Sequence, residues 1–139
     1  LRALDKQTAL VVIHDAARPF VAPESIQRAI AAAAEFGAAT VGVPCVDTIL
    51  ATDAEQWLCD APDRRFLWAC QTPQVFRTDV IHRAHEAARN KGIMATDDAT
   101  LVRRLGCKVK VVMGTPLNLK ITTPLDLQWA VWIIEKGLA

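Results

Sequence analysis

The order of strand and helix patterns near the start of the chain constrains the fold most. Residues 9–13 (ALVVI) form an apolar run rich in β-branched side chains, which is typical of a strand buried on both faces of a parallel sheet. A helical pattern over 25–36 stops at Gly37, and a second apolar run follows over 39–43 (ATVGV). This strand–helix–strand order predicts a βαβ unit and therefore an α/β fold.

The pattern is interrupted over residues 47–67, which mix short extended pieces with turn residues. We expect a hairpin or arm here that leaves the main sheet. Leaving Trp57, Leu58 and Phe66 in water would be costly, so this arm is predicted to pack against another subunit.

Helical patterns return in the second half of the chain. We expect helices from Thr78, from Thr96 and from Thr123, each of these residues acting as an N-cap, and a strand over 109–113. We interpret residues 71–74 (QTPQ) as a turn. Two tryptophans, Trp129 and Trp132, share a face of the last helix and are predicted to lie in the core.

Composition argues against several classes of protein. The 139 residues, 52% of them hydrophobic, suffice for one domain, and the net charge of +1 gives no basis for nonspecific nucleic-acid or membrane binding. The apolar runs are far shorter than the roughly 20 residues that span a bilayer. The four cysteines form no CxxC pair, which argues against zinc, and no signal-peptide pattern is present. We expect a cytoplasmic protein, or a plastid one whose transit peptide is absent.

The sharpest candidate for a ligand site follows the first predicted strand. Asp15 and Arg18 lie at the carboxyl end of that strand, where ligands gather in open α/β sheets. The carboxylate could bind a metal ion or ligand hydroxyls, and the guanidinium could face a phosphate. A salt bridge within the loop is the alternative.

A second candidate precedes the last predicted helix. Lys120 and Thr122 flank one apolar residue, so in extended chain both side chains point the same way, beside a helix N-terminus that favours anions. Together they could hold a phosphate. Alternatively, Thr123 caps the helix and Lys120 is only solvated.

Weaker signals come from Arg64 with its neighbour Arg65, and from residues 96–98 (TDD). Adjacent arginines are typical of a solvated edge, and helix capping alone explains the second stretch.

Five stretches in order, HDAARPFV, VPCVDTI, LWACQTPQVF, TDDATLV and NLKITTPLDL, resemble the 2-C-methyl-D-erythritol 4-phosphate cytidylyltransferase family. The resemblance runs from about Leu10 to Ile134. It implies a Rossmann-like nucleotidyltransferase fold, a three-layer α/β/α sandwich, with a β-arm that interlocks two subunits into a homodimer. It also implies transfer of CMP from CTP to methylerythritol phosphate, with Mg²⁺ bound mainly through the CTP phosphates and no metal ligands in this chain.

The resemblance also implies roles for individual residues. Arg64 and Lys120 match the pair that positions the acceptor phosphate for attack, and these are the expected catalytic residues. Six further positions are expected to bind substrate: Asp15, Arg18, Thr48, Thr72, Thr96 and Thr122. Several of the residues in and beside the arm are expected to reach the pocket of the other subunit.

One part of the family pattern has no counterpart. Such enzymes begin with a strand and a glycine-rich loop whose Arg and Lys bind the CTP phosphates, and this chain has neither. We therefore expect residues 1–139 to form a single incomplete nucleotidyltransferase domain, with an exposed sheet edge and little activity alone. Two alternatives stay open: a cytidylyltransferase for ribitol 5-phosphate, and a non-catalytic module that binds the acceptor or dimerises.

Overall fold

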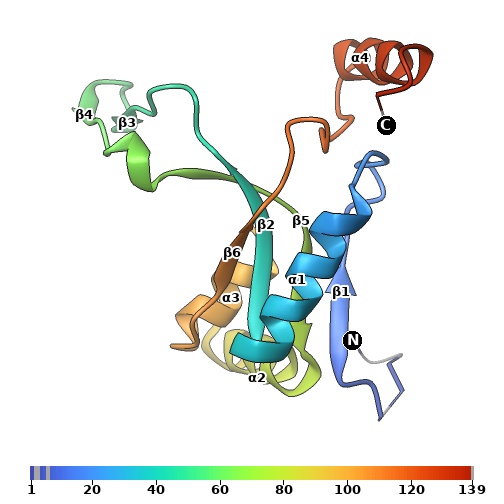
Figure 1. Ribbon diagram of the computed structural model, residues 1–139. Helices are drawn as coiled ribbons and strands as arrows, with labels where there is room; N and C mark the ends of the chain where they lie inside the picture. Colours follow the sequence, from blue (N-terminus) through green and yellow to red (C-terminus); the bar gives the residue numbers. More distant parts are fainter. Residues whose placement is uncertain (2–3, 6, 139) are drawn as a thin grey trace.

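The computed structural model describes residues 1, 4–5 and 7–138, and its centre is a four-stranded sheet with helices on both faces (Figure 1). In chain order the elements are β1 (Leu10–Ile13), α1 (Pro23–Phe36), β2 (Ala38–Pro44), β3 (Ala51–Thr52), β4 (Leu58–Asp60), η1 (Arg64–Phe66), β5 (Trp68–Arg77), α2 (Thr78–Lys91), α3 (Asp98–Arg104), β6 (Lys110–Met113) and α4 (Pro124–Glu135).

The strands lie in the order β1-β5-β2-β6. β5 is antiparallel to both of its neighbours, whereas β2 and β6 are parallel. β1 and β2 therefore run in the same direction, as a βαβ unit requires, but β5 lies between them. The prediction that the first strand is buried on both faces is wrong, because Val12 is 45% exposed on a strand whose one partner in the described sheet is β5.

Two separate hydrophobic clusters make the fold three layers deep. Neighbouring residues of a strand point to opposite faces, so Val75 belongs to the cluster under α1 and Phe76 to the cluster under α2 and α3. The first cluster is built on Ala29, Ala32, Ala33, Ala39 and Val41, and the second on Val11, Ala38, Ile81, Ala84 and Val102. This mixed α/β architecture confirms the predicted fold class.

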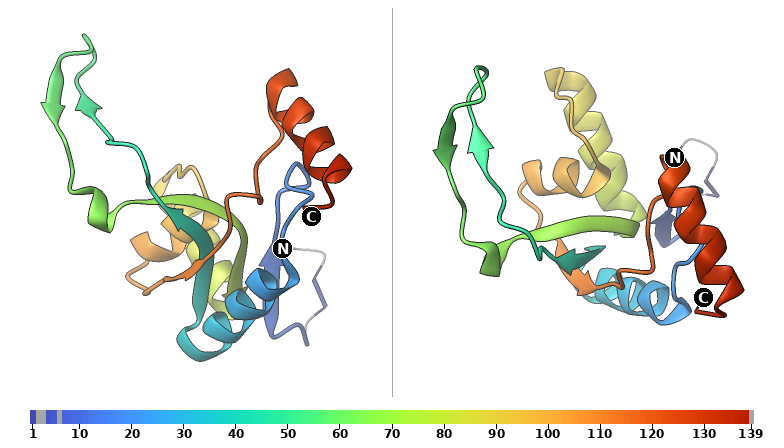
Figure 2. Two further views of the ribbon diagram at one scale, coloured as in Figure 1. Left: turned by 45° about the horizontal axis from the view of Figure 1, so that its top comes forward. Right: turned by 90° about the horizontal axis from the view of Figure 1, so that it is seen from above.

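The arm is a small hairpin carried away from the sheet (Figure 2). β3 and β4 pair only with each other, in a two-stranded antiparallel sheet. Three apolar side chains of this segment are largely exposed: Trp57 at 74%, Leu58 at 63% and Phe66 at 76%. The segment therefore has no packing of its own that removes these side chains from water.

The predicted turn over residues 71–74 is wrong, since this stretch lies inside β5. The pairing with β2 moves from Thr40–Gln74 to Gly42–Cys70, so a bulge separates the two. Pro73 has no N–H to give to a ladder, and a bulge is where a strand interior tolerates such a residue. β5 continues directly into α2, so Arg77, and not Thr78 as predicted, is the N-cap of that helix.

The prediction that Trp129 and Trp132 lie in the core is also wrong. They are 54% and 43% exposed, and their rings meet edge to face at 5.8 Å between centroids. α4 lies apart from the sheet, beside the loop that follows β1 (Figures 1 and 2). Further apolar side chains of α4 are exposed as well: Leu125, Leu127, Val131 and Ile134. Because apolar residues lie on several sides of this helix, the sequence pattern could not show which side faces the core. None of the helices described here is long and apolar enough to cross a membrane.

Candidate functional site

The loops that follow β1 and β6 meet at one edge of the sheet. The backbone N–H of Ile121 donates to the carbonyl of Ala17 at 2.8 Å, and Arg18 Nη1 donates to the carbonyl of Asn118 at 2.7 Å. β1 and β6 both run parallel to β2, so both loops leave the carboxyl ends of their strands. The two candidate motifs of the sequence are thereby brought together.

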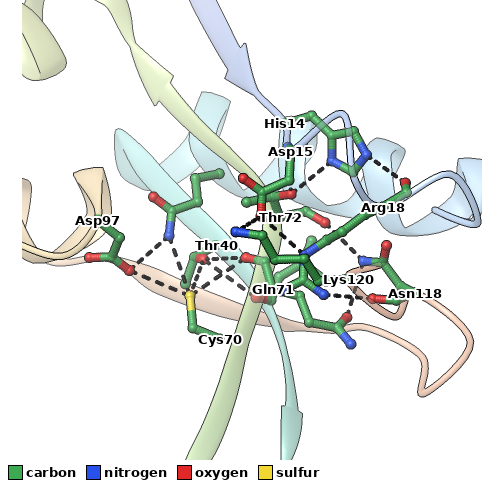
Figure 3. A network of polar contacts seen from close by, with 12 residues as sticks. His14, Asp15, Arg18, Thr40, Cys70, Gln71, Thr72, Asp97, Asn118 and Lys120 are labelled. Atoms are coloured by element: carbon green, nitrogen blue, oxygen red, sulfur yellow. Dashed lines mark hydrogen bonds and ion pairs between the residues drawn. The ribbon is translucent and has the colours of Figure 1, made fainter. Parts of the chain in front are cut away.

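A single carboxylate oxygen of Asp15 holds two cations at this edge (Figure 3). Lys120 Nζ lies 3.1 Å and Arg18 Nε 3.3 Å from Asp15 Oδ2. Burial alone would raise the pKa of the Asp15 carboxyl, but the hydrogen bonds and charges of Lys120 and Arg18 outweigh it and hold this pKa below its usual value. The salt bridge considered from the sequence exists, and it includes Lys120, which is half-exposed and could turn toward a ligand.

β5 supplies the next wall of the site. Thr72 Oγ1 accepts the Asp15 backbone N–H at 3.0 Å, which fixes the start of the loop against the strand. Two residues further along, Gln74 Nε2 donates to Asp97 Oδ2 at 3.0 Å, and Gln74 Oε1 accepts the N–H of Ala99 at 3.1 Å. The strand thus connects the loop of Asp15 to the start of α3.

Asp97, and not Thr96 as predicted, is the N-cap of α3. Its Oδ1 accepts the backbone N–H of Thr100 at 2.8 Å. Although burial raises the pKa of the Asp97 carboxyl, hydrogen bonds from Thr100, Gln74 and Cys70 outweigh it and leave this pKa below its usual value. The site therefore contains a second carboxylate that stays ionised at neutral pH.

Between these walls lies an open pocket of about 390 Å³. The pocket is lined by Ile13, Asp15, Arg18, Cys70, Gln71, Thr72, Gln74, Thr96, Asp97, Asp98 and Lys120. Three carboxylates, two cations, hydroxyls and amides in one small hollow suit a compact polar ligand that carries both an anionic group and hydroxyls.

A buried amide network supports the loop that carries Lys120. Asn118 is 1% exposed, and its Nδ2 donates to the carbonyl of Thr72 at 2.8 Å and to Gln71 Oε1 at 3.2 Å. Gln71 Nε2 in turn donates to the carbonyl of Thr115 at 3.0 Å. These bonds tie the loop after β6 to β5, so that the position of Lys120 depends on both.

Three of the predicted site residues are not brought to the pocket. Thr48 and Arg64 lie in the arm segment, and Arg64 Nη1 donates to the carbonyl of Val46, just before this segment, at 2.5 Å. Thr122 donates through Oγ1 and through its backbone N–H to Asp126 Oδ2, at 3.0 and 2.9 Å. The N–H and hydroxyl of Thr122 thus bond the carboxylate of the α4 capping box, and Lys120 lines the pocket whereas Thr122 does not.

Sequence patterns pointed to no role for His14 or Cys70. Cys70 and Gln74 lie two residues on either side of Thr72, and alternate residues of a strand share a face. Recognising β5 as a strand would therefore have placed both in the site. No comparable signal gave His14 a role, because its partner in the structure, Thr72, is 58 residues away.

Within the described part of the chain, no group of three or more His, Cys, Asp and Glu side chains is placed to hold a metal ion. Asp15 Oδ2 is already shared by two cations.

A three-layer α/β fold with a polar pocket at the carboxyl edge of its sheet defines the class of open α/β proteins, in which small ligands generally bind at that edge. The family model for 2-C-methyl-D-erythritol 4-phosphate cytidylyltransferase matches residues 1–136. The chain therefore belongs to this family.

Individual relatives agree with the family match. The chain is similar to the 2-C-methyl-D-erythritol 4-phosphate cytidylyltransferase of Caldanaerobacter subterraneus subsp. tengcongensis, with 49% identity over 98% of this chain and 60% of the relative. The enzyme of the same name from Pelotomaculum thermopropionicum is 47% identical over 97% of this chain and 57% of the relative. The chain thus spans about 60% of the length of these curated relatives.

Solved structures show the same similarity in three dimensions. The 4-diphosphocytidyl-2C-methyl-D-erythritol synthase of Anaerococcus prevotii superimposes with a TM-score of 0.90 at 32% identity, over 96% of this chain and 60% of that one. The 2-C-methyl-D-erythritol 4-phosphate cytidylyltransferase of Thermus thermophilus gives a TM-score of 0.79 at 41% identity, over 88% of this chain and 60% of that one.

Proposed function

We propose that this chain forms the acceptor-binding part of an enzyme that transfers CMP from CTP to 2-C-methyl-D-erythritol 4-phosphate. The observation that carries the proposal is the convergence of Asp15, Arg18 and Lys120 at the carboxyl edge of the sheet. The names of the relatives support the reaction, and the mixture of cations, carboxylates and hydroxyls in the pocket fits a phosphorylated polyol.

In this proposal Lys120 exchanges its carboxylate partner for the acceptor phosphate. An oxygen of that phosphate attacks the α-phosphorus of CTP, a new P–O bond forms, and the bond to the departing pyrophosphate breaks. The contribution of the chain is positioning and charge neutralisation. Mg²⁺ is expected to be held mainly by the CTP phosphates and to neutralise their charge.

We further propose a homodimer formed through the arm. Trp57, Leu58 and Phe66 supply an exposed apolar surface on a hairpin that has no packing of its own. Neither Arg64 nor Thr48 lines the pocket of its own chain, so this pocket contains no arm residue. A partner's arm that reached this pocket would bring a third cation next to Lys120.

The test requires a protein of full length, and the relatives provide one. We would replace the matching part of the Caldanaerobacter enzyme by this chain and measure Mg²⁺-dependent pyrophosphate release from CTP and methylerythritol phosphate. Lys120→Met should lower kcat/KM about a hundredfold, because it removes a cation that meets developing charge. Lys136→Met, at the C-cap of α4, is the matched control and should leave the rate unchanged.

Two results would contradict the proposal. A preference for ribitol 5-phosphate as acceptor would assign the chain to the alternative enzyme. Full activity of the Lys120→Met variant would show that the acceptor does not bind at this edge of the sheet. In a separate experiment, calorimetry on the 139-residue chain should detect binding of methylerythritol phosphate. Tight binding of CTP to this chain would overturn our assignment of the pocket to the acceptor.

A further inference from the structure

His14 makes two hydrogen bonds that determine which of its ring nitrogens carries the proton. Nε2 lies 3.0 Å from the carbonyl oxygen of Arg18, and Nδ1 lies 2.9 Å from Thr72 Oγ1. A carbonyl only accepts, so Nε2 must carry a hydrogen. In the neutral ring Nδ1 is then bare, and it can only accept the hydroxyl proton of Thr72.

The hydroxyl of Thr72 is thereby fixed in direction. Its one proton goes to His14 Nδ1, and one of its two lone pairs accepts the backbone N–H of Asp15 at 3.0 Å. What remains is a single lone pair on a residue that lines the pocket. Thr72 can therefore accept a hydrogen bond from a ligand but cannot donate one.

We propose that His14 is a positioning residue that makes Thr72 an acceptor for a hydroxyl of the polyol part of the substrate. This inference rests on the proposed function. An ionised phosphate oxygen only accepts, so it has no bond to gain from Thr72, whereas Lys120 and Arg18 offer donors. The site thus distinguishes the two ends of the acceptor, with hydroxyls toward β5 and the phosphate toward Lys120.

The first experiment tests the hydrogen-bond chain without any substrate. Long-range ¹H–¹⁵N spectra of the ¹⁵N-labelled 139-residue chain in mildly alkaline buffer should show His14 with a protonated Nε2 and a bare Nδ1. The chain has three histidines, so loss of one set of signals in His14→Gln assigns them. Thr72→Val removes the donor to Nδ1 and should shift the His14 Nδ1 signal, with those of His82 and His85 unchanged.

The second experiment measures the consequence in the full-length hybrid enzyme described above. His14→Leu should raise KM for methylerythritol phosphate about tenfold, the equivalent of one hydrogen bond, and should leave KM for CTP unchanged. His14→Gln, whose amide again offers one donor and one acceptor close together, should restore most of the affinity. His82→Leu, the same change on the exposed face of α2, is the matched control.

The two experiments separate the inference from the function on which it rests. A protonated Nδ1 with a bare Nε2 on His14, or no response of His14 to Thr72→Val, would overturn the hydrogen-bond chain. The same KM for His14→Leu and the parent hybrid would overturn the positioning role. A parent hybrid without any activity would instead contradict the proposed function, and the spectra would still decide the tautomer.

Discussion

Asp15 is the residue on which the charges of the site converge, and its ionisation couples the site to stability. Its pKa in the folded protein lies below the ordinary value because Lys120 and Arg18 stabilise the charged form more than burial destabilises it. A lowered pKa means that the folded protein binds the proton less well than the unfolded chain. The ion pairs therefore contribute stability above the unfolded pKa of about 3.9 and lose it as the pH falls through the lower folded value.

We expect Asp15→Asn to lower the free energy of unfolding by at most about 1 kcal/mol at neutral pH, since a third of the carboxylate side chain is exposed and solvent screens it. The difference from the parent should shrink as the pH falls below about 3.9. Urea unfolding over a pH series measures this. Glu35→Gln, on the exposed side of α1, is the control and should show no comparable trend. A difference that grows in acid would contradict the sign.

At the scale of residues, the sequence was informative where a polar side chain directly follows a strand. Asp15 and Arg18 could be chosen because they follow a predicted strand, at whose carboxyl end ligands gather in open α/β sheets, and Lys120 because it lies just before a predicted helix N-terminus. The hydrogen bond between Thr72 and His14 could not be predicted, because the two residues are 58 positions apart and only tertiary packing brings them together. Thr122 lies outside the pocket, and its hydroxyl donates to the capping carboxylate of Asp126, four residues on.

At the scale of elements, the end of β6 is packed so closely that it admits no side chain. A Cβ added at Gly114 would collide with the side-chain oxygen of Gln71 and would lie 2.7 Å from Val41 Cγ1. The backbone N–H of Gly114 also donates to the carbonyl of Gly42 at 2.8 Å, so the backbone cannot easily retreat. Gln71 in turn holds Asn118, and with it the loop of Lys120.

Gly114→Ala should therefore destabilise the protein by about 1–3 kcal/mol, the usual cost of overpacking, and weaken acceptor binding as well. Gly106→Ala is the matched control. Its Cβ would meet nothing within 4 Å, so only the strain of its φ of +91° remains, about 1–2 kcal/mol with no effect on the site. Chemical unfolding and acceptor KM in the hybrid enzyme measure both effects. Equal acceptor KM values for the two variants would refute the link from Gly114 to the loop.

The elements themselves were largely predictable wherever a local signal marked them. The capping box of Thr123 and Asp126 begins α4 as predicted, and Gly37 ends α1 in the left-handed conformation. β5 was not predicted because Pro73, a residue typical of turns, lies in the interior of this strand. The position of β5 between β1 and β2 could not be read from the chain, since pairing between strands distant in sequence leaves no local pattern.

At the scale of the whole molecule, the positions of Arg64 and Lys120 make a dimer testable through catalysis. Lys120 lines the pocket of its own chain, whereas Arg64 lies in the arm segment and donates to the carbonyl of Val46, which directly precedes that segment. If the arm serves the partner's pocket, each complete site takes Lys120 from one chain and Arg64 from the other. Two different inactive variants could then complement each other in a mixed dimer.

We expect hybrid enzymes with Arg64→Ala or Lys120→Ala to be nearly inactive alone and to regain activity when they are unfolded together and refolded as a mixture. Half of the dimers are then mixed, and each has one site with both cations, so about a quarter of the parent activity should return. Arg65→Ala is the matched control: its partner is Asp63, and it should keep its activity without mixing. If Arg64 instead served its own chain, every mixed dimer would hold two defective sites and no activity would return.

A second pairing shows which cations share a chain within one site. Arg18 and Lys120 meet at the same oxygen of Asp15, so both should serve the pocket of their own chain. In a mixed dimer of Arg18→Ala and Lys120→Ala, each site then lacks one of the two cations, and the activity should stay at the level of the separate variants. Recovery in this pairing would mean that Arg18 and Lys120 act in different subunits, which their shared contact with Asp15 contradicts. Recovery when Lys120→Ala is mixed with Arg64→Ala, and none when it is mixed with Arg18→Ala, would therefore identify the arm as an element that completes the site of its partner.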